Sequence, residues 1–498
     1  MVLNRPYLNR SLFLLFFVFL IHFFITGCAT NPVTGQSQFM LVSEEQEIQM
    51  GKELYPNAMW GAEGGGGEFK DEKVKTYLKN VVLNIHKVSH RPNLPVDFAI
   101  QNSSVPNAWA IPGYVVITRG LLAGLDNEAE FAFVMGHEMG HVSARHSASQ
   151  MSLSILHQAL LLGAGIALAG SDYSDAALTL GALGSSLLLL KYSRNDELEA
   201  DAIGVQYMSR LGYNPRNAIS AHKNLEKVSN EYLKSLGKSA KEAGFFEELL
   251  STHPRTSIRI DEIQGIINRT SPSVIRGDGS NRDIFQGAIG NLRRVNNIYV
   301  AHYDKAVRAL NNKKIDEAAV EISKAMNMDQ TQAPFYGLSG FIMLKKNDPT
   351  NAEKYFNYAL RLDNNYQPAL RGMGSINYMK GNFAEAKRYL NRSIALFPED
   401  MPSRYFLGMS YYKTNEFKQA INHLKRFSSS NQKHPTVHGV LGMCYEKTND
   451  QNSAYNEYVM QLKVAPNNDI GRHATNRLNA IGINKKSRLV YLNRYLFP

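Results

Sequence analysis

The chain has 498 residues, of which 44% are hydrophobic and 20% are charged. These fractions are typical of globular proteins with ample cores, and they exclude a disordered, a collagen-like or a polytopic membrane protein. The length predicts two to four domains at about 150 residues each, and two cysteines cannot form a disulfide framework. The net charge of +11 is uneven, because residues 301–498 contain 28 Lys and Arg against 16 Asp and Glu, whereas the first 300 contain 27 and 28. The two parts are therefore predicted to meet different partners.

The N-terminus has the pattern of an export signal. Arg5 and Arg10 precede an apolar run over 12–25, and the residues Ile-Thr-Gly-Cys end at Cys28. A short basic segment, a short apolar segment and small residues before a cleavage site are typical of a signal peptide, here residues 1–27. Ile-Thr-Gly-Cys also resembles the bacterial lipobox. This resemblance implies a lipid on Cys28 that anchors a periplasmic protein to the outer membrane, whereas an ordinary cleaved signal is the alternative.

Several elements are predicted before the first chemical motif. A helix is predicted to begin within 43–54, and two β-branched and aromatic segments, 96–101 and 114–118, are typical of strands. A further helix is predicted to start near Asp126 or Asn127, because Asn and Asp cap helices well and Glu residues follow in the first turn.

An H-E-x-x-H motif lies within this helix, from His137 through Glu138 to His141. Residues four apart share one face of a helix, so both imidazoles can bind one metal ion while Glu138 accepts a proton from water. The motif also occurs by chance on exposed charged helices. Here its neighbours at 131–135 are mostly apolar, which indicates a buried helix, and buried polar side chains need partners such as a metal ion.

Two apolar stretches, 153–170 and 176–190, follow the motif. They could insert into a membrane as a hairpin or form a buried helical pair. Each is short for a membrane span of about 20 residues, and glycines interrupt the pair. The sequence therefore favours the buried pair.

A catalytic zinc ion needs a third protein ligand and an open position. Ala144 and Ser147 stand where metzincins have Gly and His, so that class is excluded. Glu197 and Asp201 lie four residues apart on a later predicted helix. Glu197 is predicted to bind the metal and Asp201 to hydrogen-bond a ligating histidine, with a solvated acidic turn as the alternative.

Two neighbouring polar residues are predicted to lie away from the metal. On a continuous helix His146 lies about 140° around the axis from His141, which predicts a structural role for His146. Glu199 lies about 160° from the face that Glu197 and Asp201 share.

From residue 299 the sequence repeats with a period of 34 residues. An alanine recurs without a slip, a small residue precedes it by twelve positions, and an apolar or aromatic residue follows it by four. Small residues let paired helices approach, so this period predicts five tetratricopeptide (TPR) repeats with a concave binding face, whereas an ordinary helical bundle does not explain a constant period. Cys444 falls within a repeat and is predicted to be buried. The alanines are Ala318, Ala352, Ala386, Ala420 and Ala454.

The predicted fold class is mainly α with a small β-sheet. A zincin-type α+β metallopeptidase domain is predicted over 28–270, and an α-solenoid of TPR repeats over 298–480. Residues 271–297 are rich in Ser, Gly and Asp and are predicted to be a linker, and residues 481–498 form a basic tail.

The combined motifs resemble the gluzincin metallopeptidases of the CAAX prenyl endopeptidase and HtpX type. The similarity is carried by H-E-M-G-H from His137, by S-R-N-D-E-L-E-A-D from Ser193, and by the segments 31–35, 107–113 and 252–254. It extends over nearly the whole mature chain. With the signal sequence and the repeats, the periplasmic, TPR-containing branch of this family is the most similar, and the lipobox is a departure from it.

The resemblance implies the reaction and its central residues. His137, His141 and Glu197 would bind one zinc ion, and the reaction would be peptide-bond hydrolysis. Glu138 would be the general base that activates water and then returns a proton to the leaving amine.

The resemblance also implies further catalytic and substrate-binding residues. His253 would stabilise the oxyanion or cap the open position of the metal, and Arg259 would polarise the oxyanion or brace the ligand helix. An edge strand would pair with extended substrate backbone, which explains limited side-chain selectivity. It contains Asn107, Ala108, Trp109 and Ala110.

These features predict a periplasmic zinc endopeptidase that degrades misfolded or misassembled outer-membrane proteins. The basic TPR array would recruit unfolded clients or the assembly machinery, and export argues against nucleic acid as a partner. The alternative is a TPR chaperone or adaptor for outer-membrane protein assembly, with latent or minor proteolysis.

Overall fold

The computed structural model describes residues 28–61, 66–153, 192–237, 257–269 and 274–480. The chain divides into two compact units, Met1–Ala301 and His302–Pro498. Among the described residues, no helix has both the length and the apolar composition needed to cross a bilayer. The predicted signal peptide, the apolar stretches beyond Leu153 and the basic tail lie outside the described residues.

The first unit contains a three-stranded sheet in the order β3-β5-β4. The central strand β5 (Tyr114–Thr118) is parallel to β3 (Asp97–Gln101) and antiparallel to β4 (Ala108–Ile111). Both strands predicted from composition are confirmed to within one residue. In the described part of the chain β4 pairs with β5 alone, so it forms an edge of the sheet. A separate antiparallel hairpin joins β1 (Cys28–Thr30) to β2 (Ser37–Phe39).

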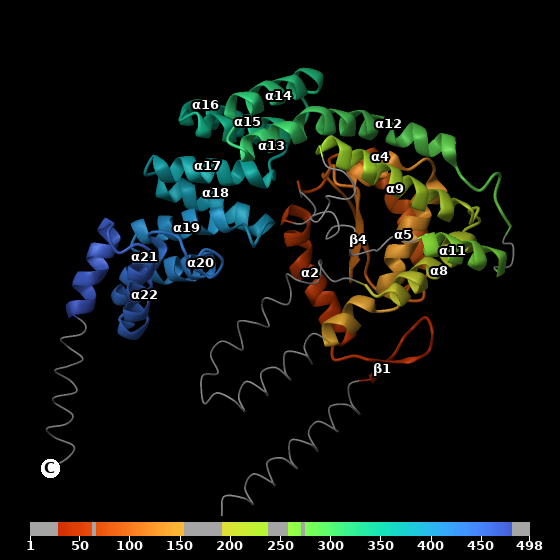
Figure 1. Ribbon diagram of the computed structural model, residues 1–498, viewed down its shortest axis with the longest axis horizontal. Helices are drawn as coiled ribbons and strands as arrows, with labels where there is room; N and C mark the ends of the chain where they lie inside the picture. The colour runs from red at the N-terminus through yellow and green to blue at the C-terminus, as the bar shows by residue number, and fades with distance from the viewer. Residues whose placement is uncertain (1–27, 62–65, 154–191, 238–256, 270–273, 481–498) are drawn as a thin grey trace, which may run out of the picture. The chain divides into compact units, whose positions relative to one another are not determined.

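The structure gives the bounds of eight helices of the first unit, whose course Figure 1 shows, and a further helical segment begins at His146. The eight helices are α2 (Glu44–Gly61), α3 (Glu72–Lys87), α4 (Arg119–Gly124), α5 (Glu128–Ser143), α8 (Arg194–Arg210), α9 (Asn217–Ser235), α11 (Ser257–Arg269) and α12 (Arg282–Ile298).

Helix α5 is the core helix of this unit, and nearly all of its residues are buried. It begins where the sequence predicts, because Asn127 is its N-cap and accepts a hydrogen bond from the first turn. Glu128 in that turn is held by three donors, the hydroxyls of Tyr77 and Tyr213 and the side-chain amide of Asn281. A carboxylate is favourable at a helix N-terminus, so these contacts fix where the helix starts.

Helices α5 and α8 pack closely through small residues. A Cβ atom added at Gly136 would lie 3.2 Å from the Cα of Gly204, and one added at Gly140 would lie 3.2 Å from the Cα of Ala200. A side chain at either position would force the neighbouring backbone to give by a few tenths of an ångström. The close approach brings side chains from both helices to one point.

The segment 271–297 differs from the linker that we predicted. Helix α12 occupies most of it and packs against α3, α4 and α5 in the first unit. Its buried residues recur every three or four positions, which is the pattern of an amphipathic helix. The Ser-, Gly- and Asp-rich composition at the start of the segment masked this pattern. The buried residues are Phe285, Ile289, Leu292, Val295 and Ile298.

The second unit consists of helix pairs, which confirms the TPR prediction (Figure 1). After a π-helical turn, η2 (Tyr299–Tyr303), five pairs follow. They are α13 (Asp304–Asn311) with α14 (Ile315–Met328), α15 (Ala333–Lys345) with α16 (Pro349–Leu362), α17 (Gln367–Met379) with α18 (Phe383–Leu396), α19 (Met401–Lys413) with α20 (Phe417–Ser430), and α21 (Val437–Lys447) with α22 (Gln451–Val464).

Four of the five pairs pack a glycine against a large side chain. A Cβ atom added at Gly340 would lie 2.5 Å from the Phe356 ring, and one added at Gly374 would lie 2.4 Å from Leu390. These are the small and apolar positions of the 34-residue pattern, and all five recurring alanines are completely buried. Cys444 is also completely buried, which raises the pKa of its thiol to about 12.

A second 34-residue period appears in the backbone. The residue after the C-cap of the first helix in each pair has a positive φ between 60° and 79°. This left-handed residue ends the helix and turns the chain into the second one. Only one of the five is glycine. They are Lys313, Asn347, Gly381, Asn415 and Asn449.

Candidate metal centre

Three predicted ligands converge at the crossing of α5 and α8. The Nε2 atoms of His137 and His141 are 3.2 Å apart. The Glu197 carboxylate lies 3.5 Å from His141 Nε2 and 3.7 Å from His137 Nε2. The exposed fractions of the three residues are 6%, 1% and 1%, so a buried donor set comes from two helices. Among the described residues, this is the one group of side chains with the mutual spacing of a metal site.

This donor set fits zinc. Two nitrogens bound to a tetrahedral zinc ion at about 2.0–2.1 Å lie about 3.3 Å from each other, close to the observed separation. Two imidazoles and one carboxylate also match the ligand types of catalytic zinc sites, which keep one position open.

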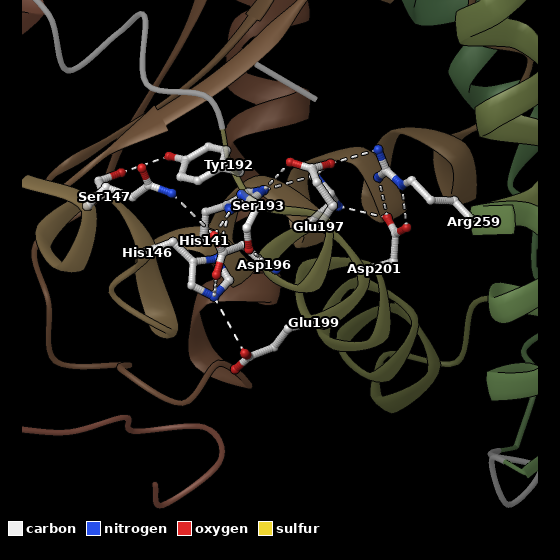
Figure 2. Close-up of polar contacts among 12 residues, drawn as sticks. His141, His146, Ser147, Tyr192, Ser193, Asp196, Glu197, Glu199, Asp201 and Arg259 are labelled. Carbon is white, nitrogen blue, oxygen red and sulfur yellow. Dashed lines mark hydrogen bonds and ion pairs between the residues drawn. The ribbon is translucent and has the colours of Figure 1, made fainter. Parts of the chain in front are cut away.

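Asp201 and Arg259 support one side of the donor set (Figure 2). His137 Nδ1 lies 2.9 Å from Asp201. Arg259 donates two hydrogen bonds of 2.7 Å to Asp201, and its third nitrogen lies 2.7 Å from Glu197. Asp201 therefore lies where the sequence predicts. The contacts of Arg259 match the bracing alternative that we predicted for it.

Asp201 and Arg259 both remain charged although they are buried. Burial alone would raise the pKa of Asp201, but the hydrogen bonds from Arg259 and the nearby imidazoles of His137 and His222 hold it well below its usual value. Burial likewise opposes the charge of Arg259, and the carboxylates of Asp201 and Glu197 overcome it and raise its pKa. Asp201 is therefore a fixed anion that orients His137 with Nε2 toward the other ligands.

Sequence reasoning missed His222 on α9. Its Nε2 lies 3.5 Å from Asp201, its ring lies against Phe133, and burial lowers its pKa. No motif marks this residue, because it reaches the site only through the packing of α9 on α5.

Sequence reasoning also misplaced His146 and overlooked Tyr192. His146 Nδ1 lies 2.9 Å from His141 Nδ1, although a continuous helix would carry His146 away. The helix ends at Ser143, so that rotation does not apply. The Tyr192 ring stacks on His141 at 3.8 Å between centroids, and its hydroxyl lies 2.7 Å from the Ser147 hydroxyl.

Glu138 lies on α5 beside the ligands and is buried. Its negative charge contributes to the raised pKa of Tyr192, which burial chiefly causes, and to the raised pKa of Arg259. His253 lies outside the described residues.

The proposed substrate strand is the edge strand β4, which packs against α5. Ala108, Trp109 and Ala110 belong to this strand, and Asn107 precedes it. The Trp109 side chain is buried and donates a hydrogen bond of 3.1 Å to Gln101. Within the described ranges the outer backbone edge of β4 pairs with no strand, whereas the Trp109 indole already has a partner.

Comparison with known proteins agrees with this geometry. Residues 72–267 match peptidase family M48, and residues 378–444 match a tetratricopeptide repeat family. The chain contains an M48 peptidase domain followed by TPR repeats. It is therefore a metallopeptidase, and the resemblance to TPR-containing relatives is confirmed.

Several relatives share one or both parts. The beta-barrel assembly-enhancing protease of Escherichia coli (strain K12) is 26% identical over 355 residues, which cover 66% of this chain and 69% of that protein. The mitochondrial metalloendopeptidase OMA1 of Arabidopsis thaliana is 33% identical over 45% of this chain and 42% of its own length. OMA1 of Schizosaccharomyces pombe is 27% identical over 49% of this chain and 67% of its own.

Proposed function

We propose that this M48 peptidase is a zinc-dependent endopeptidase that degrades misfolded or misassembled outer-membrane proteins. The convergence of His137, His141 and Glu197 carries the proposal. Bound zinc would supply a Lewis acid that polarises the scissile carbonyl and makes water reactive at neutral pH. The likeness to a beta-barrel assembly-enhancing protease supports the substrate class.

The chain's own residues account for the proton transfers and the orientation of the reactants. Glu138 accepts a proton from the attacking water and returns it to the leaving amine. Asp201 and Arg259 hold His137 and Glu197 in place, so the site does not have to reorganise during the reaction. The edge of β4 holds the substrate backbone extended. His253 retains its predicted role at the oxyanion or at the open position.

Location and recruitment complete the proposal. Cys28 carries a lipid that tethers the protein to the outer membrane from the periplasm, which the lipobox-like sequence supports. The TPR unit recruits polypeptide clients or the outer-membrane assembly machinery, and its excess of Lys and Arg favours acidic surfaces.

Replacing Glu138 by Gln tests the reaction. E138Q keeps the size of the side chain and the three ligands, so zinc content and the melting temperature should match those of the wild-type protein. Cleavage of an unfolded protein such as casein should fall by about 10²–10⁴-fold. Unchanged cleavage would contradict the role of Glu138.

The same variant separates the two candidate functions. The five complete helix pairs of the second unit favour a chaperone or adaptor role as the second candidate. If cells with E138Q clear a misassembled outer-membrane protein at the normal rate, that second function is the main one.

A further inference from the structure

His146 lies beyond the ligand helix and yet contacts a ligand. Helix α5 ends at Ser143, Ala144 is its C-cap, and Arg145 has a left-handed φ of 61°. This turn brings the His146 ring back toward α5, where its Nδ1 lies 2.9 Å from His141 Nδ1. Since His146 is only 4% exposed, the two nitrogens face each other in the interior. One of them must donate and the other accept.

The geometry of the donor set decides which ring donates. His141 Nε2 lies 3.2 Å from His137 and 3.5 Å from Glu197, so Nε2 is the atom directed at the metal position. A neutral imidazole that offers Nε2 as a ligand carries its proton on Nδ1. His141 therefore donates to His146, and His146 must present a bare Nδ1. Neutral His146 then carries its own proton on Nε2.

Two carboxylates lie in the direction of that proton (Figure 2). His146 Nε2 is 3.5 Å from Glu199 and 3.7 Å from Asp196. These distances exceed those of direct hydrogen bonds, so the attraction is electrostatic. Each carboxylate is held by another donor: Asn31 donates to Glu199 at 3.2 Å, and the Ser193 backbone N–H donates to Asp196 at 2.9 Å.

We infer that His146 is a positioning residue of the metal centre. It accepts the Nδ1 proton of His141 and thereby fixes the tautomer and the ring orientation in which His141 can bind a metal ion. Asp196 and Glu199 orient His146 in turn, and the N-terminal segment contributes through Asn31. The inference rests on the proposed function, because it requires a metal ion at the three converging ligands.

Two substitutions at position 146 separate this role from simple packing. Asn places an amide oxygen near the position of Nδ1, whereas Gln places its amide near Nε2. H146N therefore keeps an acceptor for His141, and H146Q loses it while filling more of the space. The zinc dissociation constant of the full chain is measured by competition with a chromogenic chelator. H146Q should weaken zinc binding by about 10–100-fold, and H146N by less than about 5-fold.

A spectroscopic readout reports the ligand directly. With Co²⁺ in place of zinc, the visible spectrum should shift in H146Q and remain close to wild type in H146N. The control is H86Q, since the His86 ring bonds to the backbone of Pro92 and Leu94 rather than to the site. H86Q should leave both the zinc dissociation constant and the Co²⁺ spectrum unchanged.

Clear outcomes would overturn the inference. Zinc binding by H146Q within 2-fold of wild type, or an equal loss in H146N and H146Q, excludes the acceptor role. If the substitutions at 146 prevent folding, the partly exposed Glu199 provides the test, because E199Q should weaken zinc binding about 3–10-fold, and an unchanged constant contradicts the relay. A wild-type chain that binds no zinc would instead defeat the proposed function itself.

Discussion

The two units use opposite ways of bringing helices together. In the first unit, α5 and α8 cross through glycines and aim a set of charged and polar side chains at one point. In the second unit, four of the five helix pairs cross through a glycine that faces a large apolar or aromatic side chain, and the same contact recurs every 34 residues. Close helix packing is common to both, and only the identity of the side chains at the crossing separates a reactive site from a scaffold.

This difference predicts different failures. A packing defect in one repeat weakens that repeat and its contacts with the adjacent repeats, because each helix pair contacts only the adjacent pairs. A defect in the metal centre leaves a buried charge without its partner of opposite charge, and no other group in the interior can neutralise it. The two tryptophans, Trp60 and Trp109, both lie in the first unit, so their fluorescence reports that unit alone.

The largest loss of stability is expected for R259A. Removing the guanidinium leaves Asp201 and Glu197 as buried carboxylates without their cation, which should lower the free energy of unfolding by about 3–5 kcal/mol. R259K should recover part of this loss, because Lys restores one charge but not the paired hydrogen bonds. Urea unfolding followed by tryptophan fluorescence measures both changes.

The matched control is R210A, because Arg210 lies on α8, is exposed, and donates a hydrogen bond to the Val88 carbonyl. R210A should lower the free energy of unfolding by less than about 1 kcal/mol. Equal unfolding midpoints for R259A and R210A would show that the buried carboxylates do not depend on Arg259.

A smaller loss is expected for G374L in the repeats. The new side chain would collide with Leu390, since even a Cβ atom there lies only 2.4 Å away. Overpacking of this kind costs about 1–3 kcal/mol. The helical circular-dichroism transition should shift to lower urea concentration, while the tryptophan transition stays in place.

The same substitution at Gly287 provides the control, because nothing lies within 4 Å of a Cβ atom added there. G287L should leave both transitions nearly unchanged. If G374L also shifted the tryptophan transition, the expectation that the two units unfold independently would be wrong.

The smallest effect is expected from pH. Burial, helped by the charge of Arg404, lowers the pKa of His423 to about 4 from the usual 6.5. Between these values the unfolded chain binds a proton that the folded chain does not, so this residue reduces stability as the pH falls from about 6.5 to about 4. Water screens a partly exposed group, and the loss should be on the order of 1 kcal/mol.

H423Q removes this contribution. Its circular-dichroism unfolding midpoint should fall less between pH 7 and pH 4 than that of the wild-type protein. Parallel pH profiles for the two proteins would mean that His423 titrates alike in the folded and unfolded chains.

The sequence predicts the two units unequally well. The repeat period, the buried alanines and the starts of α5 and the strands are local signals, and the structure confirms them. Helical spacing places His137 beside His141 and Glu197 beside Asp201, whereas joining the two pairs depended on the need of catalytic zinc for a third ligand and on the family resemblance. Helix α12 was mistaken for a linker, because turn-forming residues precede its apolar pattern.

The supporting residues of the metal centre were harder to predict. His222 reaches Asp201 only through tertiary packing, and His146 reaches His141 only because the helix stops at Ser143. No glycine or proline in the sequence marks the end of this helix, and Arg145 adopts a left-handed backbone conformation that is unfavourable for arginine. Such residues depend on the folded surroundings, which a linear reading of the chain does not contain.

The hairpin of β1 and β2 has a mechanical consequence. Besides Asn31, which holds Glu199, it contributes Gln38, whose amide donates to the Ala144 carbonyl, so the hairpin is fastened to the turn behind the histidines. Cys28 stands three residues before Asn31, a distance that extended chain spans in about 10 Å. If Cys28 carries an acyl chain, only a very short segment of polypeptide separates the bilayer from the metal centre. A peptidase tethered in this way would cleave polypeptides that stay close to the membrane surface and would seldom meet those that diffuse freely.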